Sequence, residues 1–120
     1  MHNWNGGGGP RPWSSMDFLT SEGSCNNPPN RWAVAAAGGN AYHPSGYSCW
    51  IRVDHGGGWT TSYYHILNTI AGGAIGRNGN VGAVGCETCA GGSASAPHVH
   101  FSLLFNGSYV DLDDVRLSRW

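Results

Sequence analysis

The chain is poor in charged side chains and in the residues that most often supply acid–base chemistry. Only 11 % of its 120 residues are charged, lysine is missing altogether, and glutamate occurs only at Glu22 and Glu87. The net charge of −1 gives no basic surface, which argues against nucleic acid and anionic membranes as partners. No apolar run approaches the roughly 20 residues that cross a bilayer. We therefore expect neither kind of partner.

Histidine, glycine and aromatic residues are plentiful instead. The chain has six histidines, 20 glycines and six tryptophans, and 40 % of its residues are hydrophobic. That share is enough to form a core, so a disordered chain is not expected. The length fits one domain, which we place at residues 1–120. Any acid–base chemistry in this domain should depend mainly on histidine.

Short apolar runs separated by turn residues indicate strands rather than helices. No segment longer than about ten residues shows a capped helical period. Gly56-Gly57-Gly58 and Asn106-Gly107 each separate two such runs, as in β-hairpins. The expected strands lie at 32–37, 47–55, 59–66, 80–84, 99–105 and 108–112. The sequence thus predicts an all-β fold, mainly of antiparallel sheets with long loops.

The four cysteines point to an oxidising compartment. Cys25, Cys49, Cys86 and Cys89 form an even set in a small glycine-rich chain, which favours two disulfides. Cys86 and Cys89 also have the spacing of a zinc knuckle, but Cys25 and Cys49 do not form a second such pair. The start, Met1-His2-Asn3-Trp4, lacks the charged and apolar parts of a signal peptide. For an exported protein we therefore expect a leader to have been removed.

The segment Pro97-His98-Val99-His100-Phe101 is the most informative for chemistry. On a strand, His98 and His100 share one face, whereas Val99 and Phe101 lie on the other. Two imidazoles side by side are typical of a metal site, although two solvated histidines on an edge strand would give the same pattern.

A zinc enzyme needs further ligands and a group that moves protons. His65, at the end of the second strand of the central hairpin, could face the same pocket as His98 and His100. His43 and His55 are expected to be solvated loop and turn residues. The HExxH motif, which supplies a glutamate base in many zinc peptidases, is lacking, so histidines would have to take and return the proton.

Taken together, these segments resemble the lysostaphin-type zinc endopeptidases. The 97–104 stretch resembles the family's H-x-H signature, and the 57–65 stretch resembles its second motif. Segments around His2 and Asp17 resemble the first motif. The 15 positions between His2 and Asp17 are similar to the spacing in the β-lytic and staphylolytic metalloendopeptidases rather than to that of lysostaphin itself.

The resemblance implies a role for each motif residue. His2, Asp17 and His100 would hold one Zn²⁺ ion, which polarises the scissile carbonyl and lowers the pKa of water. His98 would act as base toward the attacking water. His65 would donate to the oxyanion or help to move the proton.

The resemblance also implies the substrate and the setting. The family cuts glycine-containing peptide bonds, such as glycyl-glycine bonds, in the cross-links of bacterial peptidoglycan, and a secreted monomer is expected. A narrow active-site groove could exclude peptides with bulky side chains, with walls supplied by Trp4, Trp13, Tyr63 and Tyr64. Two alternatives stay open, namely an inactive module of the same fold that binds wall peptides, and a disulfide-rich β-domain with incidental metal binding.

A family disulfide matches Cys49 and Cys89, which would leave Cys25 to pair with Cys86. The pairing Cys86–Cys89 with Cys25–Cys49 remains open.

The ends of the chain depart from the family pattern. Only Met1 precedes the expected ligand His2, so we expect weak metal retention. The β-lytic relatives have, beyond the matching C-terminal end, a tyrosine that assists the transition state. Tyr42 or Tyr109 is the expected replacement, unless the function is lacking.

Overall fold

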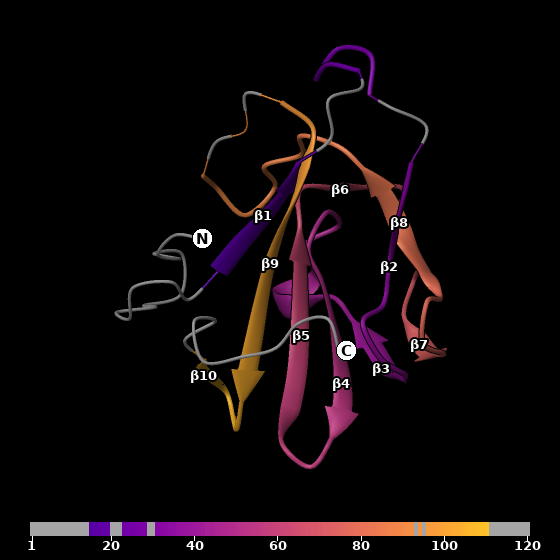
Figure 1. Cartoon of the computed structure of the whole chain (residues 1–120), viewed down its shortest axis with the longest axis vertical. Coiled ribbons are helices and arrows are strands. Elements are labelled where there is room, and N and C mark those ends of the chain that lie inside the picture. Colours follow the sequence, from indigo (N-terminus) through magenta and orange to yellow (C-terminus); the bar gives the residue numbers. More distant parts are fainter. Residues whose placement is uncertain (1–14, 20–22, 29–30, 93, 95, 111–120) are drawn as a thin grey trace.

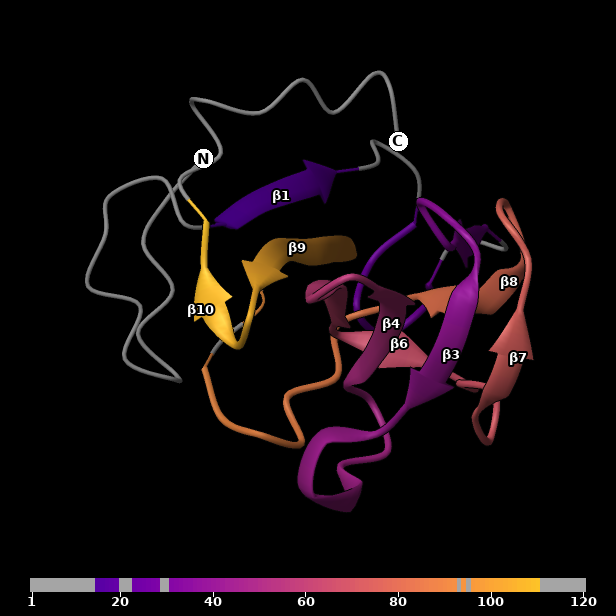
Figure 2. The ribbon, with the colours of Figure 1, turned by 90° about the horizontal axis from the view of Figure 1, so that it is seen from below.

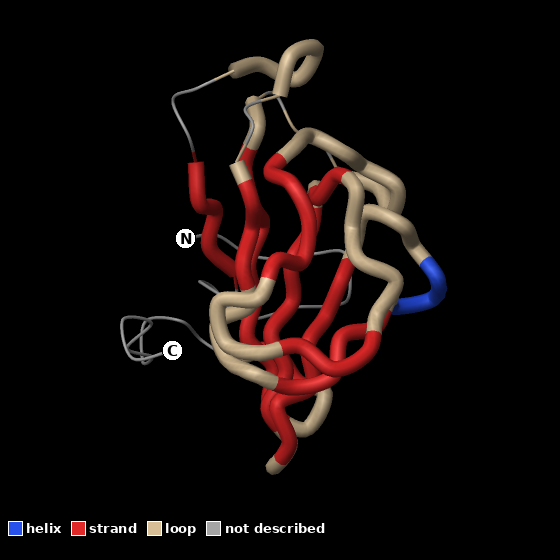
Figure 3. Tube along the Cα trace, turned by 90° about the vertical axis from the view of Figure 1, so that its right-hand side faces the viewer, coloured by secondary structure: helices blue, strands red, loops and turns tan. Residues whose placement is uncertain are grey.

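The computed structural model describes residues 15–19, 23–28, 31–92, 94 and 96–110, and their regular structure is almost entirely β-strand (Figure 1). The strands are β1 (Ser15–Leu19), β2 (Trp32–Val34), β3 (Gly39–Tyr42), β4 (Ile51–Gly56), β5 (Trp59–Tyr64), β6 (Ile66–Leu67), β7 (Gly73–Ile75), β8 (Asn80–Val84), β9 (His98–Phe105) and β10 (Ser108–Tyr109). A single-turn 3₁₀ helix, η1 (Pro44–Gly46), lies at the margin in Figure 3. Helices long and apolar enough to cross a bilayer are absent from these residues. The predicted all-β fold is confirmed.

Seven strands form the main sheet, in the order β1-β9-β5-β4-β3-β7, with β10 paired to β9 beyond the end of β1. All of these pairings are antiparallel. The long strand β9 lies between β1 and β5 and is therefore an inner strand (Figure 1). The H-x-H segment at its start is thus not on a sheet edge, which rules out the edge-strand interpretation.

The two predicted turns are both present, and their residues explain them. Gly56, Gly57 and Gly58 all have positive φ, and they join β4 to β5. Asn106 and Gly107 have φ of 50° and 82° between β9 and β10, which is the left-handed pair that a two-residue hairpin requires. These local choices fix the register of the strands that carry the site.

A smaller sheet covers one face of the main sheet. It has the order β2-β8-β6 and lies beside β3, β4 and β7, whereas β1 and β10 lie on the other side of β9 (Figure 2). Buried side chains from both sheets form the core: Ala33, Ala35, Ala41, Ile51, Val53, Tyr63, Ile66, Val81, Val84, Val99 and Phe101. The alternate residues of β9, β5 and β4 lie on the opposite face, which we call the site face.

Three strands lie outside the expected ranges, and a fourth, β6, is separate from β5, where the sequence suggested one strand over 59–66. The expected 47–55 strand begins only at Ile51. The first, β1, lies in the N-terminal region that showed little pattern, and β7 is a short glycine-containing strand. The third, β3, begins at Gly39, within the segment Gly38-Gly39-Asn40, whose composition is typical of a turn. A Cβ at Gly39 would lie 2.1 Å from the Asp54 carbonyl oxygen, so this glycine permits close strand approach rather than a turn.

Candidate catalytic and metal-binding site

Three of the histidines come together at the start of β9. His98 and His100 alternate along this strand on the site face, and His65 directly follows β5. The His65 ring centroid lies 4.5 Å from that of His98 and 6.2 Å from that of His100. Their exposed fractions are only 3 %, 8 % and 6 % for His65, His98 and His100. The pattern of His98 and His100 on one face, with Val99 and Phe101 in the core, is confirmed.

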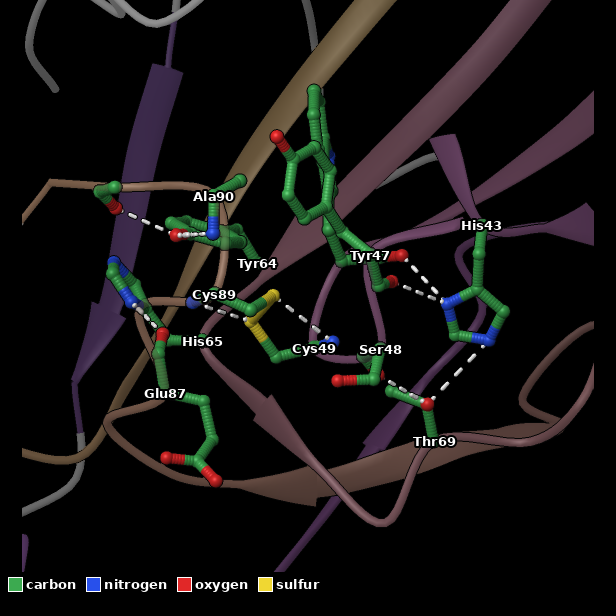
Figure 4. The surroundings of a disulfide bond; sticks show 12 residues. His43, Tyr47, Ser48, Cys49, Tyr64, His65, Thr69, Glu87, Cys89 and Ala90 are labelled. Atoms are coloured by element: carbon green, nitrogen blue, oxygen red, sulfur yellow. Dashed lines mark hydrogen bonds between the residues drawn. A yellow bond between two sulfur atoms is a disulfide. The ribbon is translucent and has the colours of Figure 1, made fainter. Parts of the chain in front are cut away.

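Backbone carbonyls orient two of these rings. Nδ1 of His65 lies 2.6 Å from the Glu87 carbonyl oxygen, and Nδ1 of His98 lies 2.8 Å from that of Ala96 (Figure 4 shows the former). A carbonyl oxygen can only accept, so Nδ1 carries the hydrogen in both rings. In the neutral ring this leaves Nε2 of each with a lone pair.

His65 is held in an unusual backbone conformation. Its φ of 69° lies in the left-handed region, which few residues other than glycine adopt. This turn directs the chain from β5 into β6 while the ring stays beside β9. Such conformations cost of order 1–3 kcal/mol and cluster at functional sites.

Tyr64 ties the site to the segment that follows Cys89. Its hydroxyl donates to the Gly91 carbonyl at 2.6 Å and accepts from the Ala90 N–H at 2.8 Å. Burial raises the pKa of Tyr64, and the hydrogen bond from Ala90 opposes that rise. The neutral phenol thus holds this segment against His65, whose ring centroid lies 4.3 Å from that of Tyr64.

Two disulfides fasten the same segment on either side of Glu87. Cys25 is bonded to Cys86, and Cys49 is bonded to Cys89. The pairing that the resemblance implied is therefore confirmed. Since none of the four cysteines is free, the zinc-knuckle interpretation and the Cys86–Cys89 pairing are wrong.

Of the two expected first-motif residues, only Asp17 lies within the described part of the chain. Asp17 lies in β1, and the antiparallel register places it directly opposite His100. His2 lies outside the described residues, as do Trp4 and Trp13. Within the described part of the chain, no three His, Cys, Asp or Glu side chains form a metal-binding group. The expected set of His2, Asp17 and His100 draws one ligand from beyond that part.

The donor types nevertheless suit zinc. Imidazole nitrogen and carboxylate oxygen are common zinc ligands, and three protein ligands leave a position open for catalysis. The register places one aspartate opposite one of the clustered histidines. The residue types present therefore fit a zinc ion.

Three other expectations need correction. His43 and His55 are half-buried rather than fully solvated, and all four of their ring nitrogens lie within 2.9 Å of a hydrogen-bond partner. Tyr63 does not line the site face. It packs edge-on against Phe101 in the core, and burial raises its pKa. Both histidines and this tyrosine are structural.

Comparison with known proteins identifies the family. Residues 12–112 match Peptidase family M23. The chain belongs to this family. The M23 match covers β1, β5 and β9, the strands that bring Asp17, His65, His98 and His100 to one end of the sheet.

Relatives named Beta-lytic metalloendopeptidase place the chain in the metalloendopeptidase part of M23. The one from Lysobacter enzymogenes is 33 % identical, over 97 % of this chain and 67 % of its own length. The one from Achromobacter lyticus is 35 % identical over 97 % of this chain, but the chain spans only 32 % of that protein. Protease LasA of Pseudomonas aeruginosa is 39 % identical over 53 % of this chain.

Solved structures give the same M23 fold. The M23 metalloprotease Pseudoalterin, from the deep sea, has a TM-score of 0.78 and 35 % identity, over 96 % of this chain and 67 % of its own. A zinc-containing peptidase from Vibrio cholerae has a TM-score of 0.60 at 20 % identity, over 88 % of this chain, and so shows the fold alone.

Some features of the site face had no distinct signal in the sequence. Glu87 contacts His65 through its backbone carbonyl, so the residue type at position 87 does not indicate this contact. Trp50 and Arg52 alternate just before and within β4, a pattern that could have placed both on the face of Ser62.

Proposed function

We propose that this chain is a secreted zinc metalloendopeptidase that hydrolyses glycine-containing peptide bonds in bacterial peptidoglycan cross-links. Residues 1–120 form a single catalytic domain, which acts as a monomer. The observation that carries the proposal is the buried cluster of His65, His98 and His100, with Nδ1 of two rings fixed by carbonyls, in a member of family M23. The two disulfides support an extracellular setting.

Metal binding would combine distant parts of the chain. His2, Asp17 and His100 would hold the zinc ion, with Asp17 and His100 contributed by paired positions of β1 and β9. When bound, zinc supplies Lewis-acid activation of the scissile carbonyl and of water. The neighbouring strand pairing holds the two ligands in register.

His98 and His65 would then move the proton. Nε2 of His98 carries a lone pair because Nδ1 donates to Ala96, so it can take the proton of the attacking water. His65 has the same arrangement and can donate at Nε2 only after it has itself gained a proton. The close approach of the two rings lets the pair pass that proton to the leaving amine, while protonated His65 would donate a hydrogen bond to the oxyanion before the proton leaves it.

Glycine selectivity would follow from the crowding around these rings. Tyr64 and the three histidines are all buried, so a substrate must bring its peptide bond close to a face with little spare room. A glycyl-glycine bond carries no side chain and meets this requirement at no steric cost. The relatives named Beta-lytic metalloendopeptidase support an endopeptidase activity.

The proposal is tested by the clearing of Gram-positive cell walls, followed as turbidity. The wild-type chain should clear the walls, a chelator should stop clearing, and added zinc should restore it. His98→Ala should lower the rate by about 10²–10⁴-fold because the proton acceptor is lost. Its thermal unfolding should match that of the wild type, which serves as the control for folding.

Two outcomes would contradict the proposal. Equal wall binding by both proteins without any clearing would identify an inactive binding module of the same fold. A metal content near zero per chain after purification in the presence of zinc would rule out a zinc enzyme.

A further inference from the structure

The site face continues beyond the histidines into a row of aromatic and polar side chains. Tyr64 contacts Trp50 edge-on, with ring centroids 6.1 Å apart. Nε1 of Trp50 donates to Ser62 Oγ at 2.8 Å, and the Arg52 guanidinium lies 4.9 Å from the centre of the Trp50 ring. This row connects the catalytic rings with a single cation, Arg52.

Arg52 reaches across the main sheet. It lies on β4 opposite Ser62 of β5, and Ser62 lies opposite Ser102 of β9. Its Nη2 donates to the hydroxyl of Tyr109, on β10, at 3.3 Å. Since β5 and β9 separate β4 from β10, the two side chains bridge a backbone separation of roughly 14 Å. The small residues Ser62 and Ser102 leave room for this bridge above the sheet.

The bridge lies one step along the strands from the catalytic rings. Tyr64 and His100 are paired across β5 and β9, and Ser62 and Ser102 form the next pair on the same face. Two residues along a strand span roughly 7 Å. A peptide extended over this face, with its scissile bond at the histidines, would bring a group about two residues away to Arg52.

The guanidinium is not neutralised by the described part of the chain. One hydrogen bond, to Tyr109, is formed there, and Nε is buried without a hydrogen-bond partner among the described residues. Asp54, the acidic residue two positions further along β4, is exposed and accepts the Gly56 N–H instead. Arginine has five donors in a planar fork that matches a carboxylate, and a buried donor without a partner is costly.

We infer that Arg52 binds a carboxylate of the peptide substrate about two residues from the scissile bond, with Tyr109 and Trp50 holding the guanidinium in place. This inference rests on the proposed function, because it makes Arg52 a specificity-determining residue for the same reaction. Trp50 restricts the guanidinium from one side through its ring face. The Tyr109 hydroxyl restricts it from the far edge of β9.

The test uses glycine peptides of four, five and six residues, each with a free C-terminal carboxylate or with a carboxamide. For the length whose end reaches Arg52, the wild type should have about 10-fold higher kcat/KM for the carboxylate, mainly through a lower KM. Arg52→Met keeps the aliphatic part of the side chain but removes the charge. Its ratio of kcat/KM for the carboxylate to kcat/KM for the carboxamide should therefore fall to near one. Arg52→Lys should be intermediate because it lacks the planar fork. Arg77→Met, at an exposed arginine, is the matched control and should keep the wild-type ratio.

The ratio separates substrate binding from a purely structural role. If Arg52 only fastened β10, Arg52→Met would lower both rates equally and leave the ratio unchanged, which would overturn the inference. A wild type that cleaves all peptides without any preference would do the same while leaving the proposed function intact. If the wild type cleaves none, the proposed function fails. Tryptophan-fluorescence titration with the same peptide pairs then decides whether Arg52 favours the carboxylate.

Discussion

At the scale of single residues, a chain of hydrogen bonds runs from the core face of the main sheet to the backbone of the segment that follows β2. His55 Nε2 lies 2.7 Å from Thr61 Oγ1, which lies 2.7 Å from the Tyr63 hydroxyl. The Ala36 N–H donates to that hydroxyl at 2.9 Å. Thr61 is fully buried, so its hydroxyl depends on these partners rather than on water.

Thr61→Val should therefore destabilise the protein although it hardly changes side-chain volume. The lost hydroxyl leaves His55 and Tyr63 without a shared partner, and we expect a loss of about 1–3 kcal/mol in the free energy of unfolding. Urea unfolding followed by fluorescence measures it. Thr60→Val, at the partly exposed neighbour on the opposite face, should change stability much less. Equal effects of the two substitutions would show that the buried hydroxyl contributes nothing.

Single residues also show where sequence reasoning succeeds. Strand alternation placed His98 and His100 on one face, and the position of His65 at the end of the central hairpin suggested that it faces the same pocket. The structure brings His65 against both. Alternation could not reveal the carbonyls that orient the rings, because backbone groups are the same in every residue. The hydrogen-bond partners of His43 and His55 were missed for a related reason, since loop position says nothing about long-range contacts.

At the scale of elements, glycine marks both the turns and the close approaches of strands. The β4–β5 turn uses three glycines with positive φ and was predicted correctly. Gly39 opens β3, and a Cβ there would collide with the backbone of Asp54 on β4. Sequence alone does not distinguish these two uses, which explains why β3 was missed. β1 was missed because its five residues do not show the sequence pattern that predicts a strand. Pairing with β9 stabilises them in this conformation.

Gly39→Ala should disrupt the β3–β4 pair. The new methyl group would lie 2.1 Å from a backbone oxygen that cannot move without breaking the register, so we expect a loss of about 2 kcal/mol or more. Thermal or urea unfolding provides the measurement. Gly38→Ala is the control, because its nearest contact would be an ordinary 3.4 Å. A Gly39→Ala protein as stable as the Gly38→Ala protein would contradict this account of β3.

At the scale of the whole molecule, the stability should depend on pH through two adjacent tyrosines on opposite faces of β5. Burial raises the pKa of both Tyr63 and Tyr64, despite hydrogen bonds that lower it. Below pH 10 the folded and unfolded chains both keep these protons. Above the unfolded value of about 10, the unfolded chain ionises while the folded chain resists, so the free energy of unfolding falls as pH rises.

Tyr63→Phe should show this alkaline dependence most clearly. It should be less stable than the wild type at pH 8, because the hydrogen bonds to Thr61 and Ala36 are lost. Its free energy of unfolding should then fall less steeply between pH 10 and 12, since one of the two phenols whose pKa is raised by burial is gone. Unfolding curves at several pH values give both quantities, and Tyr42→Phe, at an exposed tyrosine, is the control. Parallel curves for wild type and Tyr63→Phe would contradict this role of burial.

The two disulfides overlap along the chain, because Cys49 lies between Cys25 and Cys86, and Cys89 lies beyond both. A single cut of the backbone anywhere between Cys49 and Cys86 would therefore leave two fragments held together by two covalent bonds. That interval contains the β4–β5 turn and the exposed loops around β7. Nicking within that interval would thus leave the protein as one covalent unit, with His65, His98 and His100 still on joined pieces.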